Sequence, residues 1–174
     1  YKHVPKTLGK GYDYDVCNEE VLLTRLSVKN NFIVLPDGMR YRMLVLPEDT
    51  RMPVPVIKKL EALVKAGATI IGPKPKRAPG LTQYPQCDAD VKQIADRLWA
   101  KINGSSIKVN HYGKGRVFSG ETARNILLKD GVKPDFEYKG NDFIDFIHRK
   151  TAEQDIYFIT NREGKTVQCE CIFR

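Results

Sequence analysis

The sequence predicts an α/β fold, in which helices flank a mainly parallel central sheet and a β-rich portion follows at the C-terminus. Two observations predict it. Residues 41–72 read as strand, helix and strand, the pattern of a right-handed parallel crossover. From Phe143 onward the strand signals follow one another. We therefore expect an α/β domain with an N-terminal arm over residues 1–142. Over residues 143–174 we expect strands that complete the sheet or lead into a β-sandwich.

The first forty residues predict an arm, a short helix and a hairpin. Residues 1–11 read as irregular. Asn18 suits a helix N-cap, because its side chain accepts a hydrogen bond from a first-turn N–H, and acidic residues follow it. Residues 26–35 read as a hairpin around Asn30 and Asn31, whose side chains tolerate left-handed backbone angles.

The crossover is predicted from an apolar strand, an amphipathic helix and a second apolar strand. Residues 41–46 end in a continuous apolar run, as expected for a strand covered on both faces, and residues 68–71 form another. Between them, apolar residues recur at helical spacing and stop at Gly67. The helical stripe consists of Val56, Ile57, Leu60, Leu63 and Val64.

The remaining chain alternates loops, helices and short strands. Residues 72–85 hold four prolines and predict a long surface loop. Asp88 or Asp90 is the expected N-cap of the next helix, and residues 121–129 predict another that ends at Gly131. Short strands are expected at 107–110, 116–118, 143–149, 155–160 and 166–173, the last two joined by a turn at 161–164.

Charge, cysteine spacing and the lack of long apolar runs exclude several classes of protein. The 174 residues carry 29 Lys+Arg against 21 Asp+Glu, a net charge of +8, and the first residue is Tyr1, so we expect a piece of a longer polypeptide. Four irregularly spaced cysteines do not indicate a disulfide scaffold, and the C-x-C spacing of Cys169 and Cys171 is too close for zinc or thioredoxin-like sites. Neither a membrane-spanning run nor a signal peptide is visible.

Several kinds of chemistry lack their sequence patterns. The loops at 47–52 and 72–77 follow the two parallel strands, where ligands of α/β sheets bind, but neither has the closely spaced glycines of a nucleotide site. No Ser or Cys occupies a strand-to-helix turn between glycines, as a nucleophile elbow requires. His3, His111 and His148 are widely separated. We therefore predict no cofactor and no metal.

Acidic and basic groups leave two alternative functions open. The densest acidic group consists of Asp13, Asp15, Glu19 and Glu20. A self-sufficient glycosidase would need such carboxylates, but helix capping and a solvated first turn also explain them. The basic group formed by Lys74, Lys76, Arg77, Lys114 and Arg116 would suit a nucleic-acid-binding module. Because no aromatic residues interleave with these cations, we favour a solvated surface and predict neither nucleic acid nor membrane as a partner.

Three stretches together resemble the large bacterial α-L-rhamnosidases of glycoside hydrolase family 106. They are Gly11-Tyr-Asp-Tyr-Asp-Val-Cys-Asn-Glu-Glu20, Leu35-Pro-Asp-Gly-Met-Arg-Tyr-Arg-Met-Leu-Val-Leu-Pro47 and Gly67-Ala-Thr-Ile-Ile-Gly-Pro-Lys-Pro75. Phe146-Ile-His-Arg149 and Asp155-Ile-Tyr-Phe-Ile-Thr-Asn161 extend the resemblance over essentially the whole chain.

The resemblance implies a domain that follows the catalytic barrel. Such barrels take about 250 residues and do not fit here. It also implies a flavodoxin-like or class I glutamine amidotransferase-like fold, an accessory role without catalytic residues, and an exported parent enzyme, periplasmic or extracellular. The expected partners are neighbouring domains of the parent, a carbohydrate or a second copy. By position, the candidate sugar or barrel contacts are Asp15, Asn18, Glu48, Asp49 and His148.

Overall fold

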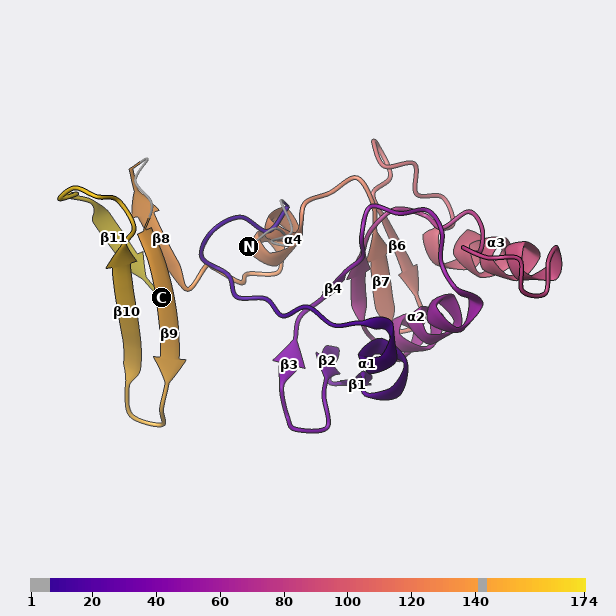
Figure 1. The fold of residues 1–174 in the computed structure, drawn as a ribbon, viewed down its shortest axis with the longest axis horizontal. Coiled ribbons are helices and arrows are strands. Elements are labelled where there is room, and N and C mark those ends of the chain that lie inside the picture. The colour runs from indigo at the N-terminus through magenta and orange to yellow at the C-terminus, as the bar shows by residue number, and fades with distance from the viewer. Residues whose placement is uncertain (1–6, 141–143) are drawn as a thin grey trace. The chain divides into compact units, whose positions relative to one another are not determined.

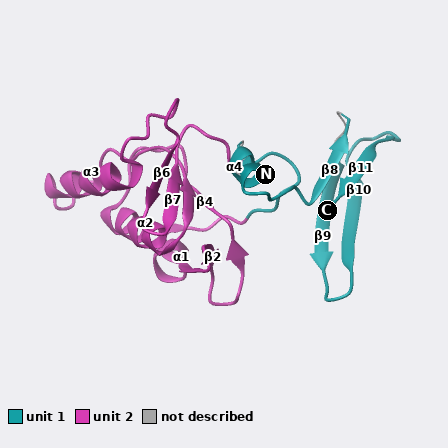
Figure 2. Ribbon diagram, turned by 180° about the vertical axis from the view of Figure 1, so that it is seen from behind, with its two compact units in different colours: residues 1–14, 124–174 teal, residues 15–123 magenta. Residues whose placement is uncertain are grey.

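The computed structural model describes residues 7–140 and 144–174, which divide into two compact units. Residues 15–123 form one unit, and the residues before and after them, up to Tyr14 and from Arg124, form the other (Figure 2). The predicted boundary between residues 142 and 143 lies outside the described residues, as does most of the predicted arm. No helix of the described part is long and apolar enough to cross a membrane.

The unit of residues 15–123 begins with a capped helix and a three-stranded meander (Figure 1). Asn18 caps α1 (Glu19–Thr24), as predicted, by accepting a hydrogen bond from the Val21 N–H at 3.0 Å. The meander consists of β1 (Ser27–Lys29), β2 (Phe32–Val34) and β3 (Arg40–Tyr41), all antiparallel. Asn30 and Asn31 have φ of 52° and 63°, which confirms the predicted hairpin turn.

A four-stranded sheet forms the centre of this unit, in the order β4 (Leu44–Val45), β5 (Thr69–Ile71), β7 (Gly115–Phe118), β6 (Val109–Tyr112). The first three strands are parallel and β6 is antiparallel at the edge. α2 (Val54–Ala66) and α3 (Gln86–Trp99) pack against each other on one side of the sheet (Figure 1). The flavodoxin-like assignment stays a prediction, because many α/β folds contain such a sheet.

The core of this unit lies between the sheet and the helices. Leu60, Ile70 and Trp99 are fully buried, and burial of each such side chain stabilises the fold by roughly 1.5–3 kcal/mol. The Trp99 indole also donates a hydrogen bond of 3.0 Å to the Gly72 carbonyl, so its single polar atom is satisfied. Gly115 is required beside this core, because a Cβ there would lie 2.3 Å from the Ala68 carbonyl oxygen.

Two details of the predicted elements are wrong. The strand expected at 41–46 is split, because β3 pairs with β2 whereas β4 pairs with β5 in another sheet. The second detail is the N-cap of α3, which is Pro85 and neither Asp88 nor Asp90. Proline is suited to the start of a helix, and Asp88 instead accepts a hydrogen bond of 2.9 Å from the Ala78 N–H.

The second unit combines α4 (Ala123–Lys129), whose first residue belongs to the other unit, with two antiparallel strand pairs. β9 (Ile144–Lys150) pairs with β10 (Asp155–Asn161), and β8 (Phe136–Lys139) pairs with β11 (Glu170–Phe173). β8 was not predicted. The turn expected at 161–164 is present, since Asn161 Oδ1 accepts a hydrogen bond from the Glu163 N–H, but the strands that it joins belong to different pairs.

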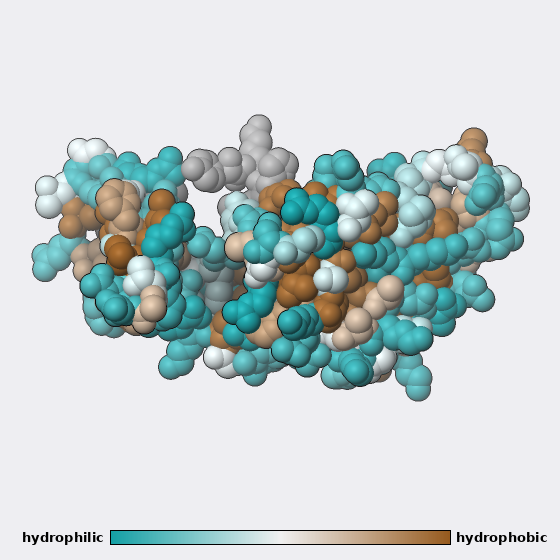
Figure 3. All heavy atoms as spheres, turned by 90° about the horizontal axis from the view of Figure 1, so that it is seen from below, coloured by the Kyte–Doolittle hydropathy of each residue, from teal (hydrophilic) through white to brown (hydrophobic). Residues whose placement is uncertain are grey.

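Aromatic rings connect the two strand pairs. Phe136 of β8 lies 5.0 Å from Phe146 of β9, and Phe173 of β11 lies 4.9 Å from Tyr157 of β10, measured between ring centroids. Other apolar side chains of these strands stay exposed, and Figure 3 shows brown spheres at the surface of this part of the chain. Phe158 is 63% exposed and Ile147, its partner across the β9–β10 ladder, is 51% exposed.

Candidate functional site

The five residues proposed from the sequence fall into different units of the structure. Asp15, Asn18, Glu48 and Asp49 belong to residues 15–123, whereas His148 belongs to the other unit. Nothing in the structure tests them as sugar or barrel contacts, and those roles stay predictions. The structure does give polar partners for Asp15, Asn18, Asp49 and His148.

Asp15 and Asn18 stabilise the start of their unit. Asn18 is the N-cap described above. Asp15 Oδ2 accepts a hydrogen bond of 2.7 Å from the Tyr41 hydroxyl, which ties the segment before α1 to β3. Burial, followed by this hydrogen bond to Asp15, raises the pKa of Tyr41 to about 12. The phenol therefore keeps its proton at neutral pH.

The predicted loops at the carboxyl ends of β4 and β5 lie side by side. The Met52 N–H donates to the Arg77 carbonyl at 3.0 Å, and the Lys76 N–H donates to the Thr50 carbonyl at 2.7 Å. Within the first loop, the Asp49 carboxylate accepts hydrogen bonds from both the side chain and the backbone of Arg51. These bonds hold the pKa of Asp49 at about 2, so this carboxylate is not suited to act as a general acid at neutral pH.

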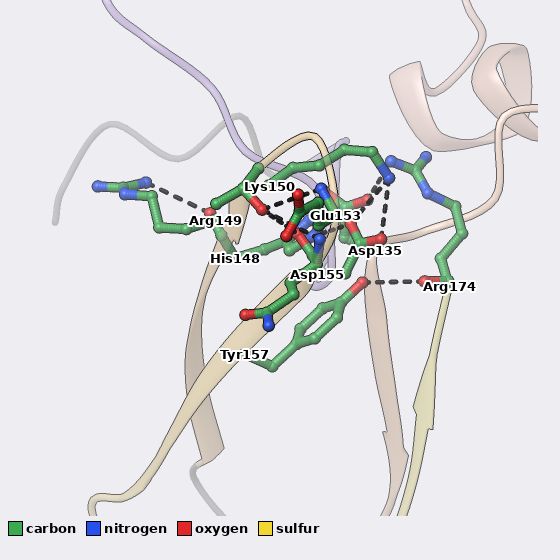
Figure 4. A network of polar contacts seen from close by, with 10 residues as sticks. Asp135, His148, Arg149, Lys150, Glu153, Asp155, Tyr157 and Arg174 are labelled. Carbon is green, nitrogen blue, oxygen red and sulfur yellow. Dashed lines mark hydrogen bonds and ion pairs between the residues drawn. The ribbon is translucent and has the colours of Figure 1, made fainter.

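A network of polar side chains surrounds His148 of β9 (Figure 4). His148 Nε2 is 2.9 Å from Asp155 Oδ1, and Nδ1 is 3.6 Å from Asp135 Oδ2. The ladder pairs His148 directly with Tyr157, and their rings stack with centroids 4.2 Å apart. The imidazole is only 12% exposed, and both of its nitrogens face carboxylates of the same unit.

Two cations complete this cluster. Lys150 Nζ lies 2.9 Å from Asp155 Oδ2, and the Arg174 guanidinium contacts Asp135 Oδ1. Lys150, and then His148, hold the pKa of Asp155 below its ordinary value. The Tyr157 hydroxyl donates to the Arg174 backbone carbonyl at 3.1 Å. Because each of these side chains contacts another, the arrangement joins the C-terminal strand to the β9–β10 hairpin.

A cavity of about 290 Å³ lies in the same unit, at the start of β8. Aromatic and charged side chains line it, a combination that occurs in many small-ligand sites. The charged groups already have partners: Arg124 pairs with Glu137, and Lys10 lies over the Tyr138 ring, 4.6 Å from its centroid. The lining residues are Gly9, Lys10, Arg124, Phe136, Glu137 and Tyr138.

No group of three potential metal ligands is found among residues 7–140 and 144–174. His3, one of the histidines considered above, lies outside those residues. Of the basic group, Lys74 Nζ lies 2.7 Å from Asp96 Oδ1, and Arg116 donates to the Thr69 hydroxyl at 3.1 Å. These two cations therefore have partners within the fold.

Sequence reasoning selected His148 but missed the residues around it. Asp135, Asp155, Tyr157 and Arg174 were not proposed as site residues, although Asp155 and Tyr157 lie in a stretch that carries the family resemblance. Strand alternation places every second residue of β9 on one face, which puts His148 on the face of Phe146. Its direct partners come from two other segments, β10 and the residue before β8, and Arg174 joins them from a third, so no pattern of adjacent residues identifies them.

Three comparisons with known proteins each gave a match. A family model described as alpha-L-rhamnosidase of the Glyco_hydro_106 family matches residues 1–174. A putative beta-glucuronidase from Formosa agariphila is 39% identical over 98% of this chain, but the match covers 14% of that protein. The solved structure of a rhamnosidase from Novosphingobium sp. PP1Y superposes with a TM-score of 0.83 at 29% identity, covering 97% of this chain and 16% of that one.

Proposed function

The chain belongs to the α-L-rhamnosidases of glycoside hydrolase family 106, and from that premise we propose that it is a non-catalytic accessory domain of a larger glycoside hydrolase. One observation carries this proposal. The matches include nearly all of this chain but only 14% and 16% of the lengths of the two relatives. A catalytic barrel of about 250 residues is longer than the whole chain, so we place the catalytic acids elsewhere in the parent.

The partners of the acidic side chains support a structural role. A glycosidase holds two carboxylates about 5–9.5 Å apart across the sugar, one of them protonated at working pH. Arg51 lowers the pKa of Asp49, and Lys150 and His148 lower that of Asp155, which favours the ionised form in both cases. These pairings suit a scaffold better than general acid catalysis.

The exposed apolar residues of β9 and β10 support contact with other parts of the parent. Phe158, Ile147 and Ile156 are about half exposed or more. A two-stranded pair is marginally stable alone, and further strands or a covering surface would stabilise it. We propose that this portion leads into a β-sandwich and that the chain braces the barrel or an oligomer interface. Its flavodoxin-like relationship is part of the same proposal.

The sugar cleaved by the parent is proposed only as a class. One relative is called a rhamnosidase and the other a putative beta-glucuronidase, so we propose a polysaccharide-degrading parent that acts on a rhamnoside or a glucuronide. Family membership also favours a periplasmic or extracellular location.

Hydrolysis assays on two proteins test the proposal. The 174-residue chain and the full parent polypeptide are incubated separately with an aryl α-L-rhamnoside and an aryl β-D-glucuronide. We expect turnover of one substrate by the parent and none by the chain. Turnover by the chain that Asp15→Asn abolishes would establish the self-sufficient glycosidase instead. Binding of the chain to nucleic acid with a steep salt dependence would favour the basic module.

A further inference from the structure

Cys169 and Cys171 bring two thiols together at the beginning of β11. Their sulfur atoms are 3.6 Å apart, with one residue, Glu170, between them in the sequence. Side chains alternate along a strand, so Cys171 projects to the same side as Phe173, and the short distance between the sulfur atoms places the Cys169 thiol beside it. Cys171 lies opposite Tyr138 in the β8–β11 ladder. Both cysteines are partly buried, so the pair is held by its surroundings and still open to small reagents.

The other two cysteines lack such a neighbour. Cys17 is exposed and Cys87 is buried, and both belong to the unit of residues 15–123. The sulfur of Cys87 lies 3.9 Å from the Gly80 carbonyl oxygen and 3.9 Å from the Asp88 carboxylate. Cys87 therefore serves as an internal control for nonspecific oxidation.

We propose that Cys169 and Cys171 are a redox-active dithiol that closes to a disulfide at the start of β11. Each thiol releases one proton to solvent, and one S–S bond forms. The two electrons pass to an oxidant of the disulfide or diazene class, which takes up two protons from solvent and is reduced to two thiols or to a hydrazine. The sulfur atoms must approach from 3.6 Å to the bonding distance of about 2.05 Å, a shift that rotation of the two side chains and a small backbone adjustment can supply.

The short spacing makes this disulfide reversible rather than a structural staple. A bridge over a single residue removes little entropy from the unfolded chain, so it adds little stability. Strained and accessible disulfides are more readily reduced than structural ones. Burial, and then the neighbouring Cys169 thiol, raise the pKa of Cys171, which keeps the thiolate fraction low at neutral pH. We therefore expect closure to require an added oxidant and to be slow in air.

The experiment uses the full chain carrying Cys17→Ser, which removes the exposed thiol that could link two molecules. The reduced protein is treated with diamide, then denatured, alkylated with iodoacetamide and digested with trypsin. The peptide of residues 166–174 contains both cysteines and ends at Arg174. We expect it to carry no alkyl group and to be lighter by two hydrogen atoms than its reduced form, while Cys87 is fully alkylated.

Reversal and substitution complete the test. Excess reduced glutathione, added under native conditions, is expected to restore alkylation of both cysteines. In Cys169→Ser and in Cys171→Ser, the remaining thiol is expected to stay open to alkylation after the same treatment. The proposal is overturned if the peptide from the Cys17→Ser chain is alkylated at both positions, or if it carries a mixed disulfide or a bond to another chain. These outcomes are independent of whether the parent hydrolyses sugars.

Discussion

Residues 15–123 and the strands that follow residue 135 are stabilised by different means. The first region buries Leu60, Ile70 and Trp99 completely between a sheet and two helices. The second has few fully buried apolar residues, and its strand pairs meet through aromatic rings and the polar cluster around His148. The first region has a core of its own, whereas the second leaves Ile147 and Phe158 exposed. The contrast indicates that the first region is self-sufficient in folding and the second depends on additional contacts.

The largest expected effect is the loss of a core side chain. Leu60→Ala empties a fully buried position between α2 and its neighbours. We expect it to lower the free energy of unfolding by about 2–5 kcal/mol. Denaturant titration followed by the fluorescence of Trp99, the only tryptophan, measures this region. Phe158→Ala is the matched control in the other region and should change stability by about 0.5 kcal/mol or less. Equal effects of the two substitutions would remove the contrast.

The next largest effect is expected at Gly11, whose backbone lies against the backbone of β8 at Phe136. Gly11 has a φ of +89°, and a Cβ there would lie 2.2 Å from the Phe136 carbonyl oxygen. Gly11→Ala should cost about 1–3 kcal/mol for the conformation alone, and more for the clash. Gly131→Ala is the control, because its φ is +75° but a Cβ would meet nothing within 4 Å. Hydrogen exchange of the β8 amides should quicken more in the first variant than in the second.

A smaller effect is expected at the hydrogen bond between Tyr41 and Asp15. Tyr41→Phe should lower the stability of residues 15–123 by about 0.5–1.5 kcal/mol. The raised pKa of Tyr41 means that its contribution is complete below pH 10.0 and is lost as the pH rises through about 12. The free energy of unfolding, measured across that pH interval, should fall more steeply for the unsubstituted chain than for Tyr41→Phe. Parallel curves would show that folding does not raise the pKa of Tyr41.

The smallest effect is expected at the exposed ion pair of Asp155. Lys150 and then His148 lower the pKa of Asp155 in the folded chain. Its contribution to stability is therefore complete above pH 3.8 and is lost as the pH falls through the lowered pKa. Asp155→Asn should remove that acid dependence from β9 and β10 and leave residues 15–123 unchanged. Hydrogen exchange of the two strands below pH 3.8 measures it. An identical acid response in both proteins would show that the cluster does not stabilise the hairpin.

Features set by neighbouring residues were predictable from the sequence. The Asn18 cap, the Asn30-Asn31 turn and the helix end at Gly67 each depend on a few adjacent residues, and the structure has all of them. The split of the predicted strand at 41–46 was not predictable, because an apolar run does not reveal that its two ends pair with different sheets. β8 was missed for a similar reason, since the strand with which it pairs, β11, lies about thirty residues later.

Less of the polar cluster around His148 than of the fold could be predicted from the sequence. His148 stands out as a histidine on a strand, but its stacking on Tyr157 depends on the exact length of the turn after β9. Its contact with Asp135 also requires the two strand pairs to meet, which no local pattern specifies. Asp49 was selected by its position after a parallel strand, and the structure adds the partner, Arg51, that lowers its pKa.

One consequence of the division into units concerns synthesis on the ribosome. The second unit is discontinuous, because its first fourteen residues are made before residues 15–123 and the rest are made afterwards. The inserted region can fold as soon as it has emerged, whereas Gly11 must wait for Asp135, the residue whose N–H its carbonyl accepts. The early segment is therefore exposed to chaperones and proteases until translation passes β8. A pause in translation after residue 123 would prolong that exposure, and a circular permutation that joins the two segments would abolish it.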